Sequence, residues 1–407
     1  MATYKEQNKL NVPHLRFPEF HGEWEKCKLG DIATLTKGSG ISKDQRSATG
    51  TPCILYGELY TTYKSEVIDY VVSRTDISDK NLVRSCANDI IIPSSGETAI
   101  DISTARCVLS PDVLLGGDLN IIRLKDGDGR FFSYQLNGVR KHDIAKIAQG
   151  VSVVHLYGES IKGLTVSFPS NKEQQKISTL LSLIDERIAT QNKLIEKLES
   201  LIKGLNDSLY AQYGGKVLTS FAELGTSYSG LSGKSAQDFG SGKPFITYLN
   251  VYSNNVINEN EFQYVAIKDD EKQNVAEYGD VLFTLSSETP REVGIGSVYL
   301  GKEKVYLNSF CFGIHITNAE IAFPPYLSYY VSSTPFRKFV YPYAQGSTRF
   351  NLCKADFEKA SIKLPTLENQ KRIYSILSHI DNKIITERQM LDLYNSQKQY
   401  LLRQMFI

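Results

Sequence analysis

The residues most able to do chemistry in this 407-residue chain lie in short polar loops, where hydrogen-bonding side chains stand beside turn-forming residues. Arginine pairs with guanine, and Asn or Gln with adenine, when such side chains reach base edges. The base-readout candidates are Lys37, Ser39, Ser94, Ser95, Glu97, Tyr228, Ser229, Lys234, Ser286, Ser287, Glu288, Arg291, Gln345, Ser347, Thr348 and Arg349. For each Ser or Thr, capping of a turn is the alternative interpretation. Arg291 and Arg349 are favoured, because an arginine beside Ser or Thr in a loop has little structural purpose.

Two stretches of excess positive charge are candidates for contact with phosphates. Residues 334–363 hold six basic side chains against two acidic ones, and residues 130–162 hold five against two. The basic residues are Arg337, Lys338, Arg349, Lys354, Lys359 and Lys363, and Arg130, Arg140, Lys141, Lys146 and Lys162. The whole chain has a net charge of only +1, which argues against non-specific coating of nucleic acid.

Catalytic and metal chemistry have no comparable pattern. The six cysteines and six histidines show no paired metal-ligand spacing. The Gly-containing turn Lys37-Gly-Ser-Gly40 is not a dinucleotide fingerprint, and no phosphate-binding P-loop is present. Phe323-Pro-Pro-Tyr326 approaches the Asn/Asp-Pro-Pro-Tyr of adenine methyltransferases, but phenylalanine has no acceptor for an amino group. We interpret it as a turn before a buried helix and expect no catalytic residue, metal or cofactor on this chain.

The elements that position these loops occur twice, because the chain is a repeat of itself. Gln149-Gly150 recurs as Gln345-Gly346, and Glu173-Gln-Gln-Lys-Ile177 as Asn369-Gln-Lys-Arg-Ile373, both at an offset of 196. Upstream, Pro52–Tyr56 matches Pro244–Tyr248 at 192, and Asp89-Ile-Ile-Ile matches Asp280-Val-Leu-Phe at 191. A unit that occurs only twice, at so long a period, is a duplicated domain and not a solenoid.

Each copy begins with about 150 residues of strand-like sequence rich in Tyr, Phe, Ile, Val and Thr. Asn88-Asp89 and Gly279-Asp280 are turn signals before short apolar strands. Leu164, Val166 and Phe168 alternate before Pro169, as do Ala360, Ile362 and Leu364 before Pro365. Such alternation predicts a strand with one buried face.

Each copy ends in a long helix. Ser170 and Glu173 have the spacing of a capping box, and Thr366 and Asn369 form a weaker version. Apolar residues then recur at alternating steps of four and three, which is typical of a coiled-coil seam. The seam positions are Ile177, Leu181, Ile184, Ile188, Gln191, Ile195, Leu198, Ile202, Leu205 and Leu209, and Ile373, Leu377, Ile380, Ile384, Glu387, Leu391, Tyr394, Lys398, Leu401 and Met405. We expect an antiparallel pair in which the equivalent residues Gln191 and Glu387 set the register through a hydrogen bond; solvation at the seam edge is the alternative.

The composition, 41% hydrophobic and 22% charged, is that of a folded globular protein. No apolar stretch approaches the roughly 20 residues that span a bilayer, and the polar N-terminal residues are unlike a signal peptide. The sequence therefore predicts a cytoplasmic protein without membrane contact.

The chain resembles the specificity subunits of type I restriction-modification systems. The resemblance covers both halves. It rests on Arg16-Phe-Pro-Glu-Phe-His-Gly-Glu-Trp24 with Lys28-Leu-Gly-Asp-Ile32, on the two turn–strand–Ser/Thr loops 88–98 and 279–289, on Gln345-Gly-Ser-Thr348, and on the strand–proline–helix junctions. In the first half the Gln-Gly-Ser-Thr run is replaced by Gln149-Gly-Val-Ser152, which puts equivalent DNA contacts there in doubt.

The resemblance implies an α+β chain with two β-rich target-recognition domains, each followed by a spacer helix. It implies an N-terminal tail at 1–16, domains at 17–169 and 213–364, and helices at 170–212 and 365–407. Such a subunit reads a bipartite, asymmetric sequence of double-stranded DNA. It docks two modification (methyltransferase) subunits and restriction (nuclease-translocase) subunits, which carry S-adenosylmethionine, ATP and Mg. A coiled-coil scaffold without DNA binding and a self-contained methyltransferase are the rival hypotheses.

Overall fold

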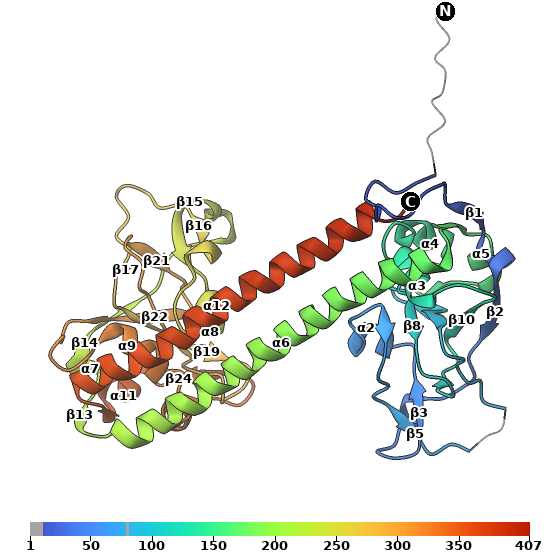
Figure 1. Ribbon diagram of the computed structural model, residues 1–407. Helices are drawn as coiled ribbons and strands as arrows, with labels where there is room; N and C mark the ends of the chain where they lie inside the picture. The colour runs from blue at the N-terminus through green and yellow to red at the C-terminus, as the bar shows by residue number, and fades with distance from the viewer. Residues whose placement is uncertain (1–10, 79–80) are drawn as a thin grey trace, which may run out of the picture. The chain divides into compact units, whose positions relative to one another are not determined.

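The computed structural model describes residues 11–78 and 81–407, so residues 1–10 of the expected N-terminal tail lie outside the described part. The chain divides into unit 1 (Met1–Lys193 with Gln389–Ile407) and unit 2 (Leu194–Arg388). The two longest helices, α6 (Asn171–Tyr213) and α12 (Leu367–Gln404), each contribute one half to each unit (Figure 1).

Unit 1 is built on a five-stranded sheet of order β2-β10-β6-β8-β4. Its strands are β2 (Ala33–Lys37), β10 (Leu119–Leu124), β6 (Asp89–Pro93), β8 (Arg106–Val108) and β4 (Val67–Ile68). Three smaller sheets pair β1 (Glu25–Lys28) with β12 (Thr165–Phe168), β3 (Thr51–Ile54) with β5 (Arg74–Thr75) and β9 (Leu114–Leu115), and β7 (Ser95–Gly96) with β11 (Val154–His155). The short helices are α1 (Leu29–Ile32), α2 (Glu58–Thr61), α3 (Gly129–Asn137), α4 (Lys141–Ile147), α5 (Gly158–Lys162) and the 3₁₀ turn η1 (Lys43–Gln45).

Unit 2 repeats this plan around a four-stranded sheet of order β14-β22-β18-β20. Its strands are β14 (Gly225–Ser229), β22 (Cys311–Ile316), β18 (Val281–Thr284) and β20 (Gly296–Val298). A two-stranded sheet pairs β13 (Val217–Thr219) with β25 (Ile362–Leu364). A four-stranded sheet has the order β16 (Gln263–Val265), β15 (Phe239–Ile246), β21 (Val305–Leu307) and β17 (Val275–Ala276). A three-stranded sheet has the order β19 (Ser286–Ser287), β24 (Phe350–Leu352) and β23 (Ala344–Gln345). The short helices are α7 (Phe221–Leu224), α8 (Tyr248–Ser253), α9 (Pro324–Tyr330), α10 (Thr334–Val340), α11 (Lys354–Lys359), and the 3₁₀ turns η2 (Ala236–Asp238), η3 (Glu259–Glu261) and η4 (Tyr341–Tyr343).

The duplication predicted from the sequence is confirmed, and equivalent strands pair in the same register. Cys53 lies opposite Leu114 in a parallel pair of unit 1, and Phe245 lies opposite Tyr306 in a parallel pair of unit 2, each shifted by the expected 192. The predicted turns are also present, since Asn88 and Gly279 have φ values of 78° and 93° directly before Asp89 and Asp280. Phe323 precedes the first residue of α9, in which Tyr326 is fully buried, as expected.

One strand departs from its predicted pattern. Ile362 and Leu364 of β25 are buried on one face, with Lys363 exposed between them. In β12, however, Val166 and Ser167 are both buried. The amide of Gln135 covers the second face by donating a hydrogen bond to the Ser167 carbonyl.

The long helices pair antiparallel in both units. In unit 1, Arg187 Nε donates to the Tyr394 hydroxyl at 3.0 Å, and Asp185 contacts Lys398. In unit 2, Arg388 pairs with Glu199 at 2.6 Å, and Arg372 lies over the Tyr213 ring. In each unit, residues with higher numbers in α6 contact residues with lower numbers in α12, as an antiparallel pair requires.

Every predicted seam position is buried or half-buried, and all but Met405 lie within α6 or α12, so the period read from the sequence is confirmed. Gln191 and Glu387 are 9% and 8% exposed, which is more burial than a solvated edge would give. Glu387 also pairs with Lys383 one turn earlier. The hydrogen bond between Gln191 and Glu387 stays a prediction, because the two residues belong to different units.

The capping box predicted at the start of α6 is wrong. The buried carboxylate of Glu173 accepts hydrogen bonds from Arg16 Nε and Nη2 at 2.7 and 2.8 Å, instead of from its own helix terminus. A bidentate guanidinium offers two charge-assisted bonds and displaces a single local one. The weaker cap at α12 is present, with the backbone amide of Asn369 donating to the Thr366 hydroxyl at 3.4 Å.

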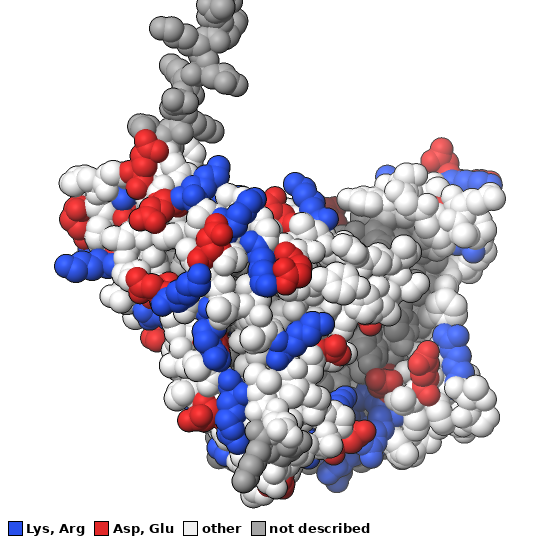
Figure 2. All heavy atoms as spheres, turned by 90° about the vertical axis from the view of Figure 1, so that its right-hand side faces the viewer, with Lys and Arg blue, Asp and Glu red and all other residues white. Residues whose placement is uncertain are grey.

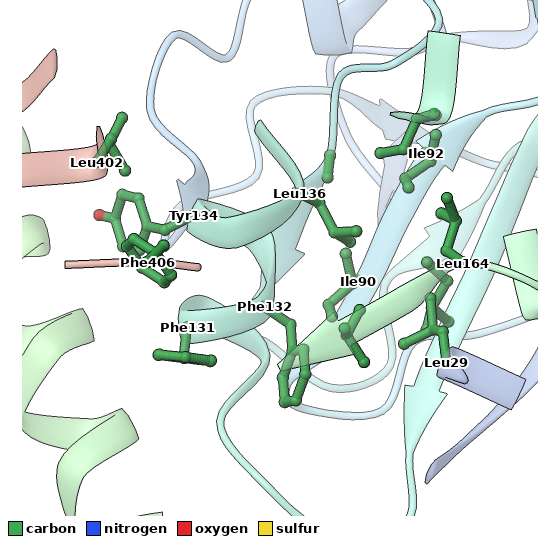
Figure 3. Packing of buried hydrophobic residues seen from close by; sticks show 14 of the residues in the cluster. Leu29, Ile90, Ile92, Phe131, Phe132, Tyr134, Leu136, Leu164, Leu402 and Phe406 are labelled. Carbon is green, nitrogen blue, oxygen red and sulfur yellow. The ribbon is translucent and has the colours of Figure 1, made fainter. Parts of the chain in front are cut away.

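The end of the chain completes the core of unit 1. Leu402, Met405 and Phe406 are buried there, and Figure 3 shows Leu402 and Phe406 beside Tyr134 and Phe131 of α3. The Phe406 ring lies 5.1 Å from that of Phe131. Because these residues come from the C-terminal segment, unit 1 is a domain closed by both ends of the described chain.

Candidate nucleic-acid interface

In unit 2, four of the residues predicted to contact DNA lie exposed in the hairpin between β23 and β24. Gln345 and Asn351 face each other at its base, and Ser347, Thr348 and Arg349 are exposed at its tip. Gly346 has a φ of 141°, and a Cβ there would lie 2.1 Å from the Arg349 carbonyl oxygen. Only glycine tolerates that backbone conformation, so Gly346 permits the tight turn that places the three polar side chains at the hairpin tip.

Arg349 is oriented by a neighbouring strand. The hairpin pairs with β19, where Ser286 lies opposite Asn351. Arg349 Nη2 donates to the Ser286 hydroxyl at 3.2 Å, and the guanidinium lies 5.6 Å from the centre of the Phe310 ring. Two weak restraints on an exposed guanidinium leave most of its donors free, which is the state required for reading a guanine edge or a phosphate.

A pocket of about 580 Å³ lies beside this hairpin and brings together residues from α8, from β19 and the loop that follows it, and from the hairpin tip. Its lining residues are Tyr248, Leu249, Tyr252, Ser286, Ser287, Glu288, Glu292, Thr348 and Arg349. The hydroxyls of Thr289, Tyr252 and Ser287 donate to the Glu292 carboxylate at 2.7, 2.8 and 3.1 Å and lower the pKa of that carboxyl. The site therefore holds fixed acceptors beside a cationic donor and two tyrosine rings.

Unit 1 contains the same hairpin with different chemistry. Gln149 bridges His155, and β11 pairs with β7 so that Ser95 faces His155. Gly150 has a φ of 122°, and a Cβ there would again lie 2.1 Å from a carbonyl, that of Val153. The tip residues are Val151, Ser152 and Val153, and Val151 is 97% exposed.

Unit 1 also has an open pocket, of about 860 Å³. Tyr56 lines it, as its repeat equivalent Tyr248 lines the pocket of unit 2. Exposed Lys43, Gln45 and Arg46 line it together with the acidic residues Glu58 and Asp118. Sequence reasoning missed Lys43, Gln45 and Arg46 and the tyrosines Tyr248 and Tyr252. The repeated Pro–Tyr segment marked the position of Tyr56 and Tyr248, but only as evidence of duplication.

Several other candidates in unit 1 have structural partners. The Ser39 hydroxyl accepts the Val83 amide at 2.7 Å, and Ser94 is buried against Asp118. Both hydroxyls therefore bond to parts of the chain 44 and 24 residues away, and neither contact caps a local turn. Lys37 and Glu97 are exposed, and Lys37 lines a groove of about 360 Å³ with Tyr157 and Lys162.

Two of the basic candidates serve the fold. Arg140 donates to the Ile407 carbonyl at 2.8 Å and pairs with Asp143 at 3.3 Å, which fastens the C-terminus. Lys234 is buried against Glu271 and the Ala266 carbonyl. Lys141 is half-buried and Lys146 is exposed on α4, where Lys146 pairs with Asp143 at 3.6 Å.

Charge is mixed on the face drawn in Figure 2, where lysines and arginines are interspersed with acidic residues. On this face, an anionic partner would therefore contact local clusters of positive charge. Within residues 11–78 and 81–407, no group of His, Cys, Asp or Glu has the arrangement of a metal site, and no helix is long and apolar enough to cross a membrane.

The fold and the paired hairpins define a class of protein with two copies of one recognition domain. The family model of the type I restriction modification DNA specificity domain matches residues 21–200 and 226–393. The chain therefore belongs to that family and is a type I restriction-modification specificity subunit with two target-recognition domains.

An individual relative agrees with this assignment, and two solved structures share the fold. A type I restriction enzyme specificity subunit, MjaX, from Methanocaldococcus jannaschii is 26% identical over 95% of this chain and 93% of its own length. The crystal structure of a type I restriction-modification S subunit from M. genitalium superimposes with a TM-score of 0.57 and 18% identity, covering 97% of this chain and 99% of that one. A structure from work on complex assembly of the type I R-M system gives a TM-score of 0.58 and 15% identity, covering 93% and 96%.

Proposed function

We propose that this chain reads a bipartite, asymmetric sequence of double-stranded DNA, with one half-site recognised by each unit. The observation that carries the proposal is that one hairpin scaffold occurs twice with different tips. Ser347, Thr348 and Arg349 offer donors for base edges, whereas Val151 and Val153 offer apolar contacts of the kind that suit a thymine methyl group. Because the side chains differ, the two half-sites should differ as well.

The proposal assigns the docking of modification and restriction subunits to α6 and α12. In unit 1, Leu183 and Leu393 are exposed on these helices, and in unit 2 so are Leu201 and Ile385. In this proposal, these exposed apolar side chains are contact points for the partner subunits. The chain itself would be non-catalytic, with S-adenosylmethionine, ATP and Mg bound by the partner subunits.

A methylation map tests this function. The chain would be co-expressed with its cognate modification subunit in a host without other adenine methylation, and the DNA sequenced by a method that detects N6-methyladenine. We expect a bipartite motif with two unlike half-sites and a constant gap. A folded, assembled complex that leaves DNA unmethylated and binds it without salt dependence would favour the scaffold alternative.

Two variants make the map sharper. Arg349→Ala removes the charged donor of one hairpin, and Val151→Ser removes an apolar group from the other. Each variant should change methylation at a single, different half-site. If both changed the same half-site, the assignment of one half-site to each unit would be wrong.

A further inference from the structure

Unit 2 contains a second pocket, separate from the one beside Arg349 and unlike it in charge. It has a volume of about 620 Å³ and is lined by four basic residues, Lys203 of α6, Arg291, and Arg337 and Lys338 of α10. Ser332 and Tyr341 add hydroxyl groups. No Asp or Glu is among the described residues that line it. Asp207, which is not a lining residue, accepts a hydrogen bond from the backbone amide of Thr334 at 2.9 Å.

The base of this pocket is a cation without an acidic partner. The guanidinium of Arg337 donates to three carbonyls, those of Gly294, Arg291 and Val293, at 2.5, 2.9 and 2.7 Å. Carbonyl dipoles satisfy its hydrogen bonds but do not neutralise its charge. These contacts also hold the loop from Arg291 to Gly294, so Arg337 positions the arginine at the pocket rim.

The three basic residues at the rim remain available. Lys203, Arg291 and Lys338 are exposed, and within the described residues none of them forms an ion pair with a carboxylate. Four positive charges around one concavity repel one another, and an anion placed among them relieves that repulsion. The Tyr341 hydroxyl beside the cations offers a neutral donor of the kind that commonly accompanies Arg and Lys around phosphate oxygens, whereas the Ser332 hydroxyl already donates to the Tyr329 carbonyl at 3.0 Å.

The repeat shows that the fold does not require this charge. By the offsets that relate the two copies, Lys203, Arg291 and Lys338 correspond to Gln399, Ile100 and His142 in unit 1. The duplicated fold therefore forms without these three charges, and the basic cluster is particular to unit 2.

We propose that this pocket binds a backbone phosphate of duplex DNA next to the half-site read by unit 2, an inference that rests on the proposed function. The loop 288–294 separates it from the pocket beside the hairpin: Glu288 and Glu292 line one pocket and Arg291 lines the other. A phosphate held on one side of this loop would fix the position of the base-reading side chains on the other. Its contribution should be independent of the base sequence.

The test compares two variants with the same loss of charge in the assembled complex with modification subunits. The pocket variant is Lys203→Gln/Arg291→Gln/Lys338→Gln, which leaves Arg337 in place because of its structural contacts. The control variant is Lys243→Gln/Lys272→Gln/Lys302→Gln, which neutralises three exposed lysines of unit 2 outside the pocket. DNA affinity is measured against salt concentration, and phosphate contacts are mapped by ethylation interference.

We expect the pocket variant to bind about tenfold more weakly and its slope of log K against log salt to become less negative by about 1, as for one lost phosphate. Interference should disappear at one or two phosphates flanking one half-site, while the methylated sequence stays the same. The control variant should keep every interference position.

Three results would overturn the proposal. The first is an unchanged slope and interference pattern in the pocket variant, and the second is equal weakening of both variants. The third is loss of the modification subunits from the pocket variant, which would make the pocket a protein-docking site. Failure of the proposed function itself is distinguishable, because the unmodified complex would then show no methylation motif and no salt-dependent binding.

Discussion

Replacing Lys398 with methionine should destabilise unit 1 strongly. Lys398 lies at a seam position of α12, only 9% exposed, and its ammonium group contacts the carboxylates of both Glu66 and Asp185 at 2.5 Å. Asp185 also accepts hydrogen bonds from the Tyr134 hydroxyl at 2.7 Å and from Ser65 at 2.9 Å. Methionine keeps the length of the side chain but leaves two buried carboxylates without their cation.

The magnitude follows from these contacts. At an effective dielectric constant of about 20, each contact at 2.5 Å supplies roughly 6–7 kcal/mol of Coulomb attraction, much of it offset by the desolvation of three charges. Loss of one partner from a buried ion pair typically costs about 3–5 kcal/mol, and we expect a value in that range. Burial lowers the pKa of Lys398, but Glu66 and Asp185 raise it further, so it lies above the ordinary 10.5. The stabilisation is therefore complete at neutral pH and is lost only as pH rises above 10.5 toward the folded-state pKa.

Urea unfolding followed by tryptophan fluorescence measures this effect in unit 1 alone. Trp24 is the only tryptophan in the sequence, is 3% exposed, and packs against Phe131. The triple variant Glu66→Gln/Asp185→Asn/Lys398→Met should regain much of the lost stability, because it removes the unpaired charges. A loss below about 1 kcal/mol in the single variant, or a triple variant as unstable as the single one, would refute the reasoning.

Three further predictions concern the hairpin, the C-terminus and a buried carboxyl group. Gly346→Ala should cost about 1–3 kcal/mol locally, because its Cβ would lie 2.1 Å from the Arg349 carbonyl; a methylation map should show loss at one half-site with an unchanged Trp24 unfolding transition. Deletion of residues 405–407 removes the buried Met405 and Phe406 and should destabilise unit 1 by roughly 3–5 kcal/mol or more, measured by the same fluorescence transition. Burial raises the pKa of Asp381 above 3.8 although the Tyr329 hydroxyl donates to it, so unit 2 should lose stability as pH rises from 3.8 through the folded-state pKa. Asp381→Asn should remove that loss, so that hydrogen exchange in unit 2 becomes less dependent on pH, and an unchanged dependence would contradict the assignment.

The contrast between Asp185 and Asp381 shows how the two copies have diverged at one equivalent position. Each aspartate accepts a tyrosine hydroxyl, from Tyr134 in unit 1 and from Tyr329 in unit 2. Only Asp185 has a lysine beside it, because the position equivalent to Lys398 is Ile202. The two copies of the fold therefore bury different polar groups at equivalent core positions, just as their hairpin tips carry different side chains.

The sequence by itself determined the repeat, the long helices with their seam, and the turns before the central strands. These features are periodic or local: a seam position such as Leu181 is marked by neighbours three and four residues away, and Asn88 by the residues that follow it. The family resemblance rested on the same duplicated order of short motifs, and the family match confirms it.

Only the tertiary structure decided which polar side chains are free. Lys234 is held by Glu271, 37 residues away, and Lys398 by Glu66, 332 residues away. Arg337 is engaged with carbonyls of the loop that carries Arg291. No local pattern encodes such partners, because a charged residue in a loop has the same sequence signature whether it faces water or a distant carboxylate. The sequence favoured Arg349 and Arg291, but only the folded chain shows that Lys234 and Arg140 are held by structural partners.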